Sequence, residues 1–129
     1  MWLSESKRLR PAKVMLAGGY SAGVSPGGEA MYHAAVFNIG EKTAVNVEVS
    51  MLPAGAFSAP QKSKARARRA ALEGGGGKWE VTLACKVKSS TPPGRHPLML
   101  TVRADNAERE DSTVFYEVRE APPPQAKSR

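Results

Sequence analysis

Apolar and polar residues alternate with a period of two along most of this chain. Because successive side chains of a strand point to opposite faces of a sheet, this period predicts β-strands. In segment 43–52, for example, Val45, Val47, Val49 and Met51 predict one buried face. Five segments carry the pattern clearly: 29–38, 43–52, 78–88, 97–103 and 112–119. Turn residues join most of them, which predicts an all-β, antiparallel, immunoglobulin-like β-sandwich of about seven strands, with an open barrel as the alternative.

Weaker signals complete the expected organisation. A short apolar run at 12–16, ahead of the breaker Gly18-Gly19, predicts a first edge strand. Segment 29–38 is apolar on both faces, which predicts a central, covered strand, and 38–42 predicts a hairpin-like connection. We expect three parts: a charged N-terminal arm (1–11), the sandwich (12–120) and a Pro-rich disordered tail (121–129).

The segment 54–77 lacks the strand pattern. Its part 61–72 is rich in Ala, Arg and Lys, which are good helix formers, and the glycine run 74–77 would end a helix there. We therefore expect a basic, Gly-rich insertion with a turn or two of marginal helix on a flexible tether.

Charge adds a candidate binding site. The chain has 19 Lys and Arg against 12 Asp and Glu, a net charge of +7, which favours acidic partners of any kind. The insertion concentrates this charge in five candidate partner-binding residues: Lys62, Lys64, Arg66, Arg68 and Arg69. Two interpretations stay open: a solvated loop, or an electrostatic arm that orders against an acidic protein surface.

Nucleic acid is the alternative partner for segment 62–69. Non-specific phosphate binding needs only such positive charge. However, the segment has no aromatic residue to stack on bases, and Tyr32 and Trp79 are better explained as core residues. An acidic protein surface fits at least as well.

The residues that carry catalysis or bind metals are scarce. Cys85 is the only cysteine, so no intrachain disulfide or thiolate cluster can form, and its alternation with Trp79 and Leu83 predicts a small buried side chain. The two histidines lack further ligands at metal-site spacing; we interpret His33 as packed on an apolar strand and His96 as solvated at a turn. We expect no enzyme activity, no metal and no cofactor.

The sequence also bears on cellular location. A single cysteine favours a reducing compartment. The basic start is followed by no apolar stretch of signal-peptide length, and no run approaches the length of a membrane helix. These features favour the cytoplasm or an assembled particle.

Three stretches carry a resemblance to a known family. They are the turn 24–28 leading into 36–40, the alternating valines of 44–49, and the Pro-Gly turn with its following strand at 91–102. Together they resemble the bacterial and archaeal Ig-like modules of the NEW3 and CARDB type, which are relatives of fibronectin type III domains. His96-Pro97 departs from the aromatic residue usual after that turn. The resemblance implies a spacer, adhesion or docking role and carries over no catalytic residues.

The leading functional hypothesis is therefore an interaction or structural module that packs on itself as a homo-oligomer or on a larger assembly, such as a filament, a shell or a virion. Electrostatic nucleic-acid binding through 62–69 is the alternative. A third hypothesis, an accessory carbohydrate-binding domain, requires an exposed aromatic platform, for which Trp79 is the candidate.

Overall fold

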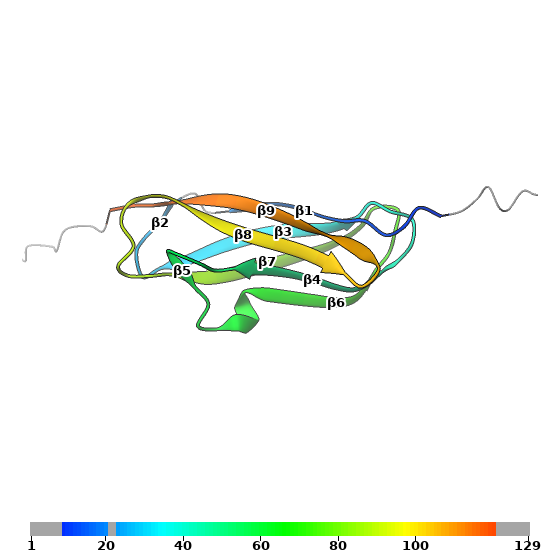
Figure 1. Ribbon diagram of the computed structural model, residues 1–129, viewed down its shortest axis with the longest axis horizontal. Helices are drawn as coiled ribbons and strands as arrows, with labels where there is room; N and C mark the ends of the chain where they lie inside the picture. The colour runs from blue at the N-terminus through cyan, green and yellow to red at the C-terminus, as the bar shows by residue number, and fades with distance from the viewer. Residues whose placement is uncertain (1–8, 21–22, 121–129) are drawn as a thin grey trace, which may run out of the picture.

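The computed structural model describes residues 9–20 and 23–120, which form two β-sheets packed face to face (Figure 1). One sheet has four strands in the order β1-β3-β7-β5, and the other has five in the order β2-β9-β8-β4-β6. The strands are β1 (Val14–Tyr20), β2 (Gly23–Val24), β3 (Glu29–Asn38), β4 (Ala44–Leu52), β5 (Phe57–Ser58), β6 (Arg66–Leu72), β7 (Gly77–Val87), β8 (Gly94–Ala104) and β9 (Ala107–Val118). Seven of them have seven residues or more, and the predicted sandwich is confirmed.

Valine, leucine and alanine side chains from both sheets fill the space between the sheets. Tyr116 on β9 is fully buried among them, and its hydroxyl donates a hydrogen bond of 2.6 Å to the carbonyl of Met31 on β3. The ring of Phe57 meets Tyr116 edge-on at 5.7 Å. These contacts join the two sheets at one end of the core.

The first strand continues further than its glycines predicted. Gly18 and Gly19 pair with Ala34 and His33, so the predicted break is wrong, although β1 does lie at a sheet edge. A side chain at Gly18 would collide with the carbonyl oxygen of His33. Glycine is therefore needed there for close approach of the backbones.

The connection 38–42 is not a hairpin, because β3 and β4 belong to different sheets. Asn38 is fully buried and organises this crossing. Its Oδ1 accepts hydrogen bonds from the backbone N–H groups of Lys13 and Gly40, and its Nδ2 donates to the carbonyls of Lys42 and Leu72. One amide side chain thus satisfies four backbone groups from three segments.

The segment 54–77 differs most from expectation. It forms β5, a short 3₁₀ helix η2 (Lys62–Lys64) and β6, so the predicted helix and the absence of strands are wrong. Pairing of β6 with β4 overrides the helix propensity of its alanines and arginines. The glycine run is a turn tied to the 38–40 loop, because Gly75 and Gly76 donate to the carbonyls of Gly40 and Asn38.

One residue inverts the alternation of β4. Asn46 has a φ of 56°, in the left-handed region. Val47, Val49 and Met51 are buried as predicted, but Val45, on the other side of Asn46, is 42% exposed, so its predicted burial is wrong. Among non-glycine residues, asparagine tolerates this backbone conformation best.

The predicted arm and tail lie mostly outside the described residues, which include only Leu9, Arg10 and Pro11 of the arm. There, the Arg10 N–H donates to the Glu41 carboxylate at 2.7 Å.

Candidate interaction surface

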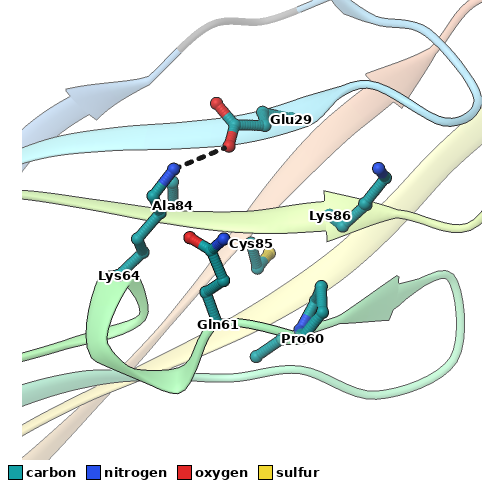
Figure 2. A pocket seen from close by; sticks show the side chains of 8 residues that line it. Glu29, Pro60, Gln61, Lys64, Ala84, Cys85 and Lys86 are labelled. Atoms are coloured by element: carbon teal, nitrogen blue, oxygen red, sulfur yellow. Dashed lines mark ion pairs between the residues drawn. The ribbon is translucent and has the colours of Figure 1, made fainter.

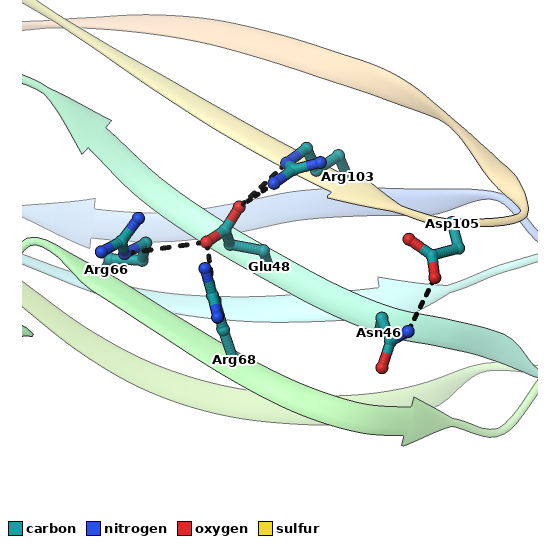
Figure 3. A network of polar contacts seen from close by, with 6 residues as sticks. All are labelled: Asn46, Glu48, Arg66, Arg68, Arg103 and Asp105. Atoms are coloured by element: carbon teal, nitrogen blue, oxygen red, sulfur yellow. Dashed lines mark hydrogen bonds and ion pairs between the residues drawn. The ribbon is translucent and has the colours of Figure 1, made fainter.

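A carboxylate surrounded by arginines lies on the outer face of the five-stranded sheet (Figure 3). Glu48 of β4 is paired with Arg68 of β6 on one side and Arg103 of β8 on the other. Its oxygens lie 2.9 Å from Arg68 Nε, 2.6 Å from Arg103 Nη2 and 3.7 Å from Arg66 Nε. We call Glu48, Arg66, Arg68 and Arg103 the Glu48 cluster.

The cluster keeps its carboxylate charged. Burial raises the pKa of Glu48, but the hydrogen bonds and charges of Arg68 and Arg103 outweigh burial and lower it. The Glu48 side chain is only 9% exposed, whereas the side chains of Arg66, Arg68 and Arg103 are 48%, 69% and 56% exposed. Three positive charges against one negative leave this surface with an excess of positive charge.

The other predicted contact residues have separate surroundings. Lys64 Nζ lies 3.7 Å from the Glu29 carboxylate, and Arg69 Nε donates to the carbonyl of Ala71 at 2.9 Å. Lys62 lies exposed in η2. The structure therefore brings together only Arg66 and Arg68 of the five. Sequence reasoning missed Arg103, because the proximity of Arg103 depends on the β4–β8 register.

An apolar patch occupies the other end of the same sheet face. Leu52 and Met99 are each 44% exposed and pair across β4 and β8. Phe115 of β9 is 42% exposed and pairs with the exposed Pro97. The Arg95 guanidinium lies 4.7 Å from the centre of the Phe115 ring. We call Leu52, Pro97, Met99 and Phe115 the apolar patch. The sequence could have indicated it, because these apolar residues stand at strand positions that alternate with the buried ones.

Cys85 lines a cavity of about 310 Å³ beside Pro60, Gln61 and Lys64, with the Glu29–Lys64 ion pair nearby (Figure 2). The residue is 4% exposed, which confirms its predicted burial. Burial, with a smaller effect of the Glu29 charge, raises the pKa of the thiol to about 11. The thiol is therefore protonated at neutral pH and is a poor nucleophile.

The histidines differ from one another. His33 is exposed on the outer face of β3, so its interpretation as a packed residue is wrong; its Nδ1 lies 3.1 Å from Thr82 Oγ1. His96 is half-buried, with Nε2 2.8 Å from the carbonyl of Pro92, so it is less solvated than predicted. Within residues 9–20 and 23–120, no three His, Cys, Asp or Glu side chains are grouped to hold a metal ion.

Two further observations bear on the hypotheses. Trp79 is half-buried and packs against the core, so it does not form an exposed platform. The described part of the chain contains no helix that could cross a membrane.

Comparison with known proteins gives information on the fold. No protein-family model and no curated protein matches the sequence. Among solved structures, the CARDB domain of a Pyrococcus furiosus protein, solved in complex with di-metal ions, is 17% identical over 84% of this chain and 89% of that domain, with a TM-score of 0.55. A solution NMR structure of that domain gives 16% identity and a TM-score of 0.52, covering 84% of this chain and 95% of the domain.

A Listeria innocua β-glucosidase mutant bound to laminaribiose is 17% identical over 85% of this chain, with a TM-score of 0.51. The match spans only 16% of that enzyme's length. At such identities a likeness shows the fold alone. The resemblance predicted from the turn motifs is confirmed at that level: this chain folds as an immunoglobulin-like β-sandwich, similar in fold to the CARDB domain.

Proposed function

We propose that the protein is a non-enzymatic interaction module that docks on an acidic surface of a partner protein through the segment Lys62–Arg69. One observation carries the proposal: Arg66 and Arg68 are held with Arg103 around a single carboxylate, and their guanidinium groups remain exposed. A guanidinium presents five N–H donors, so a group that already binds one carboxylate oxygen keeps donors for another carboxylate.

The arrangement of this segment supports a protein partner. β6 is a sheet-edge strand, so the backbone that carries its arginines is already ordered and need not be ordered on binding. The segment contains no aromatic residue on which bases could stack, which makes nucleic acid the weaker alternative.

Charge reversal at the ends of the segment tests the proposal. We choose Lys62→Glu and Arg69→Glu, because neither residue is paired with Glu48 and the fold should be unaffected. The probe is fluorescently labelled poly-L-glutamate, titrated by anisotropy from low to physiological salt. We expect each reversal to weaken binding several-fold, with a smaller salt dependence.

Lys78→Glu is the matched control, since it changes the net charge equally. It should alter binding less because Lys78 lies on the other sheet. The absence of poly-L-glutamate binding at low salt, or equal loss in all three variants, would contradict the proposal. Binding to single-stranded DNA but not to poly-L-glutamate would favour the nucleic-acid alternative. Light scattering on the same samples shows whether the partner is a second copy of the chain.

A further inference from the structure

We infer that the outer face of the five-stranded sheet binds a protein segment that is both acidic and apolar, with its carboxylates on the Glu48 cluster and its apolar side chains on the apolar patch. The acidic half of this inference rests on the proposed function. The apolar half, and the requirement that one segment carries both, do not.

The two surfaces belong to one continuous face. Along β4 the outward positions run from Leu52 through Ser50 to Glu48, and along β8 from Met99 through Thr101 to Arg103. The face therefore changes from apolar to polar to charged over one pair of neighbouring strands. Four large apolar residues gathered at outward positions, three of them more than 40% exposed, are typical of binding sites.

The register also sets the spacing that a partner must match. Met99 and Arg103 are four residues apart on one strand, roughly 13 Å at about 3.3 Å per residue. An extended segment covers that distance in about four residues, and a helix in about nine. The partner should therefore carry apolar and acidic groups at such a separation.

Charge favours an acidic segment over a second copy of this chain. Arg95 lies over Phe115, so positive charge borders the apolar patch at one end of the face, and the arginines of the Glu48 cluster lie at the other end. A second copy turned to bring like ends together would set arginine clusters against each other. Turned the other way, it would set the arginines of the Glu48 cluster beside Arg95, which lies opposite Glu117 on β9. Positive charges would then again face each other. An acidic partner instead meets the excess positive charge of the Glu48 cluster, and of the nearby carboxylates on β9, Asp111 is paired with Arg109 and Glu117 lies opposite Arg95.

Selection from a random peptide library tests the inference without requiring that the partner be identified. A displayed library of random 16-residue peptides is panned on the immobilised full chain, and enriched peptides are synthesised and titrated. We expect the enriched peptides to combine Asp or Glu with Leu, Phe or Trp at the separation given above.

Two substitutions then locate the binding site. Met99→Asp should weaken binding of the enriched peptides about tenfold or more, because it places a charge in the apolar patch and repels carboxylates. Met15→Asp is the matched control: Met15 is 40% exposed on the other sheet, and the variant should bind like the wild type. Thermal unfolding of both variants checks that the fold is retained.

Every outcome of the experiment is informative. The inference fails if no peptide is enriched, if the enriched peptides lack either carboxylates or apolar residues, or if Met99→Asp and Met15→Asp bind equally. Purely acidic peptides that depend on Lys62 and Arg69 but not on Met99 would overturn this inference and leave the proposed function standing. Purely apolar peptides that bind the patch would overturn the inference, because the Glu48 cluster would then take no part in binding.

Discussion

Glu48 is the residue on which most of the surface chemistry depends. A nearly buried carboxylate loses much of its hydration, and this cost is offset only when other groups satisfy its oxygens. Here guanidinium groups from β6 and β8, the two strands that flank β4, do so. The same contacts hold the edge strand β6 to the sheet, so Glu48 has a structural role and also positions arginines for an external ligand.

Glu48→Gln should lower the free energy of unfolding at pH 7 by roughly 1–3 kcal/mol, the usual range for hydrogen bonds to a charged group. Because the folded pKa of Glu48 lies below its unfolded value, the carboxylate stabilises the fold above that unfolded value. This stabilisation is lost as the pH falls through the folded pKa. Urea titrations at pH 7 and near pH 3 should therefore show that the difference in unfolding free energy between the wild type and Glu48→Gln is smaller in acid.

The control is Glu80→Gln, since the Glu80 side chain is 74% exposed and its ion pair with Lys78 lies at the surface. That change should cost less than about 0.5 kcal/mol at either pH. A Glu48→Gln protein as stable as the wild type at pH 7 would show that the cluster contributes no stability.

Asn46 offers a second test at the residue scale. Both Asn46→Val and Asn46→Gly remove the 2.7 Å hydrogen bond to the Asp105 carboxylate, so the difference between them reports the backbone alone. At a φ of 56°, valine should be less stable than glycine by about 1–2 kcal/mol, despite its higher strand propensity. Denaturant midpoints of the two variants give this difference directly; equal midpoints would contradict it.

At the scale of elements, the strands differ in how clearly the sequence pattern predicts them. β7 and β8 are covered on one face, so burial forces alternation and their residues reveal them. β6 lies at a sheet edge with mostly exposed side chains, and nothing in its composition requires alternation. Its strand conformation comes from pairing with β4, a long-range contact that local propensity cannot reveal.

The loop crossings show the same limit. Segment 25–28 is a turn where the sequence indicated one, but whether a turn stays in one sheet or crosses to the other depends on tertiary packing. The residue that fixes the crossing after β3 is Asn38, which follows Tyr32, Ala34 and Val36 on the inward face of the strand. The alternation places it inward, but a polar side chain there does not reveal which backbone groups it bonds. Similarly, the sequence showed that Arg66 and Arg68 belong to a segment rich in positive charge, but not that Arg103 lies beside the same carboxylate.

Asn38→Ala should destabilise the protein by about 3 kcal/mol, because it leaves buried backbone groups of Gly40 and Leu72 without partners. Asn106→Ala is the matched control. Asn106 likewise bonds backbone groups through its side-chain amide, those of Val45 and Thr43, although two rather than the four of Asn38, and it is exposed, so water can replace it. Asn106→Ala should lower the free energy of unfolding by less than about 1 kcal/mol. Thermal or urea unfolding compares the two variants. Equal losses of stability would show that burial of Asn38 is unimportant.

At the scale of the whole molecule, the two sheets have different outer faces. The five-stranded sheet carries the Glu48 cluster and the apolar patch. The outer face of the four-stranded sheet carries the exposed Met15, and small residues such as Ala17 and Ala35 lie with His33 and Glu80 around a shallow depression. The molecule is therefore polarised, and a partner bound to one face leaves the other accessible.

Cys85 reports on the integrity of the whole sandwich. With a pKa of about 11 and almost no exposure, it should react with iodoacetamide at pH 7.5 at least about a hundredfold more slowly than in the urea-unfolded chain. The measurement is the mass of the intact protein over time. Comparable rates in both states would mean that the sheets separate readily around β7.

The position of Tyr116 has a consequence for synthesis. Its ring and the neighbouring Val118 complete the core from β9, the last strand, which also pairs with β2 near the start of the chain. On the ribosome, the earlier strands must therefore wait for residues up to 118, with Leu98 and Leu100 of β8 uncovered. Until then the apolar side chains of these strands stay exposed, which favours aggregation of the nascent chain.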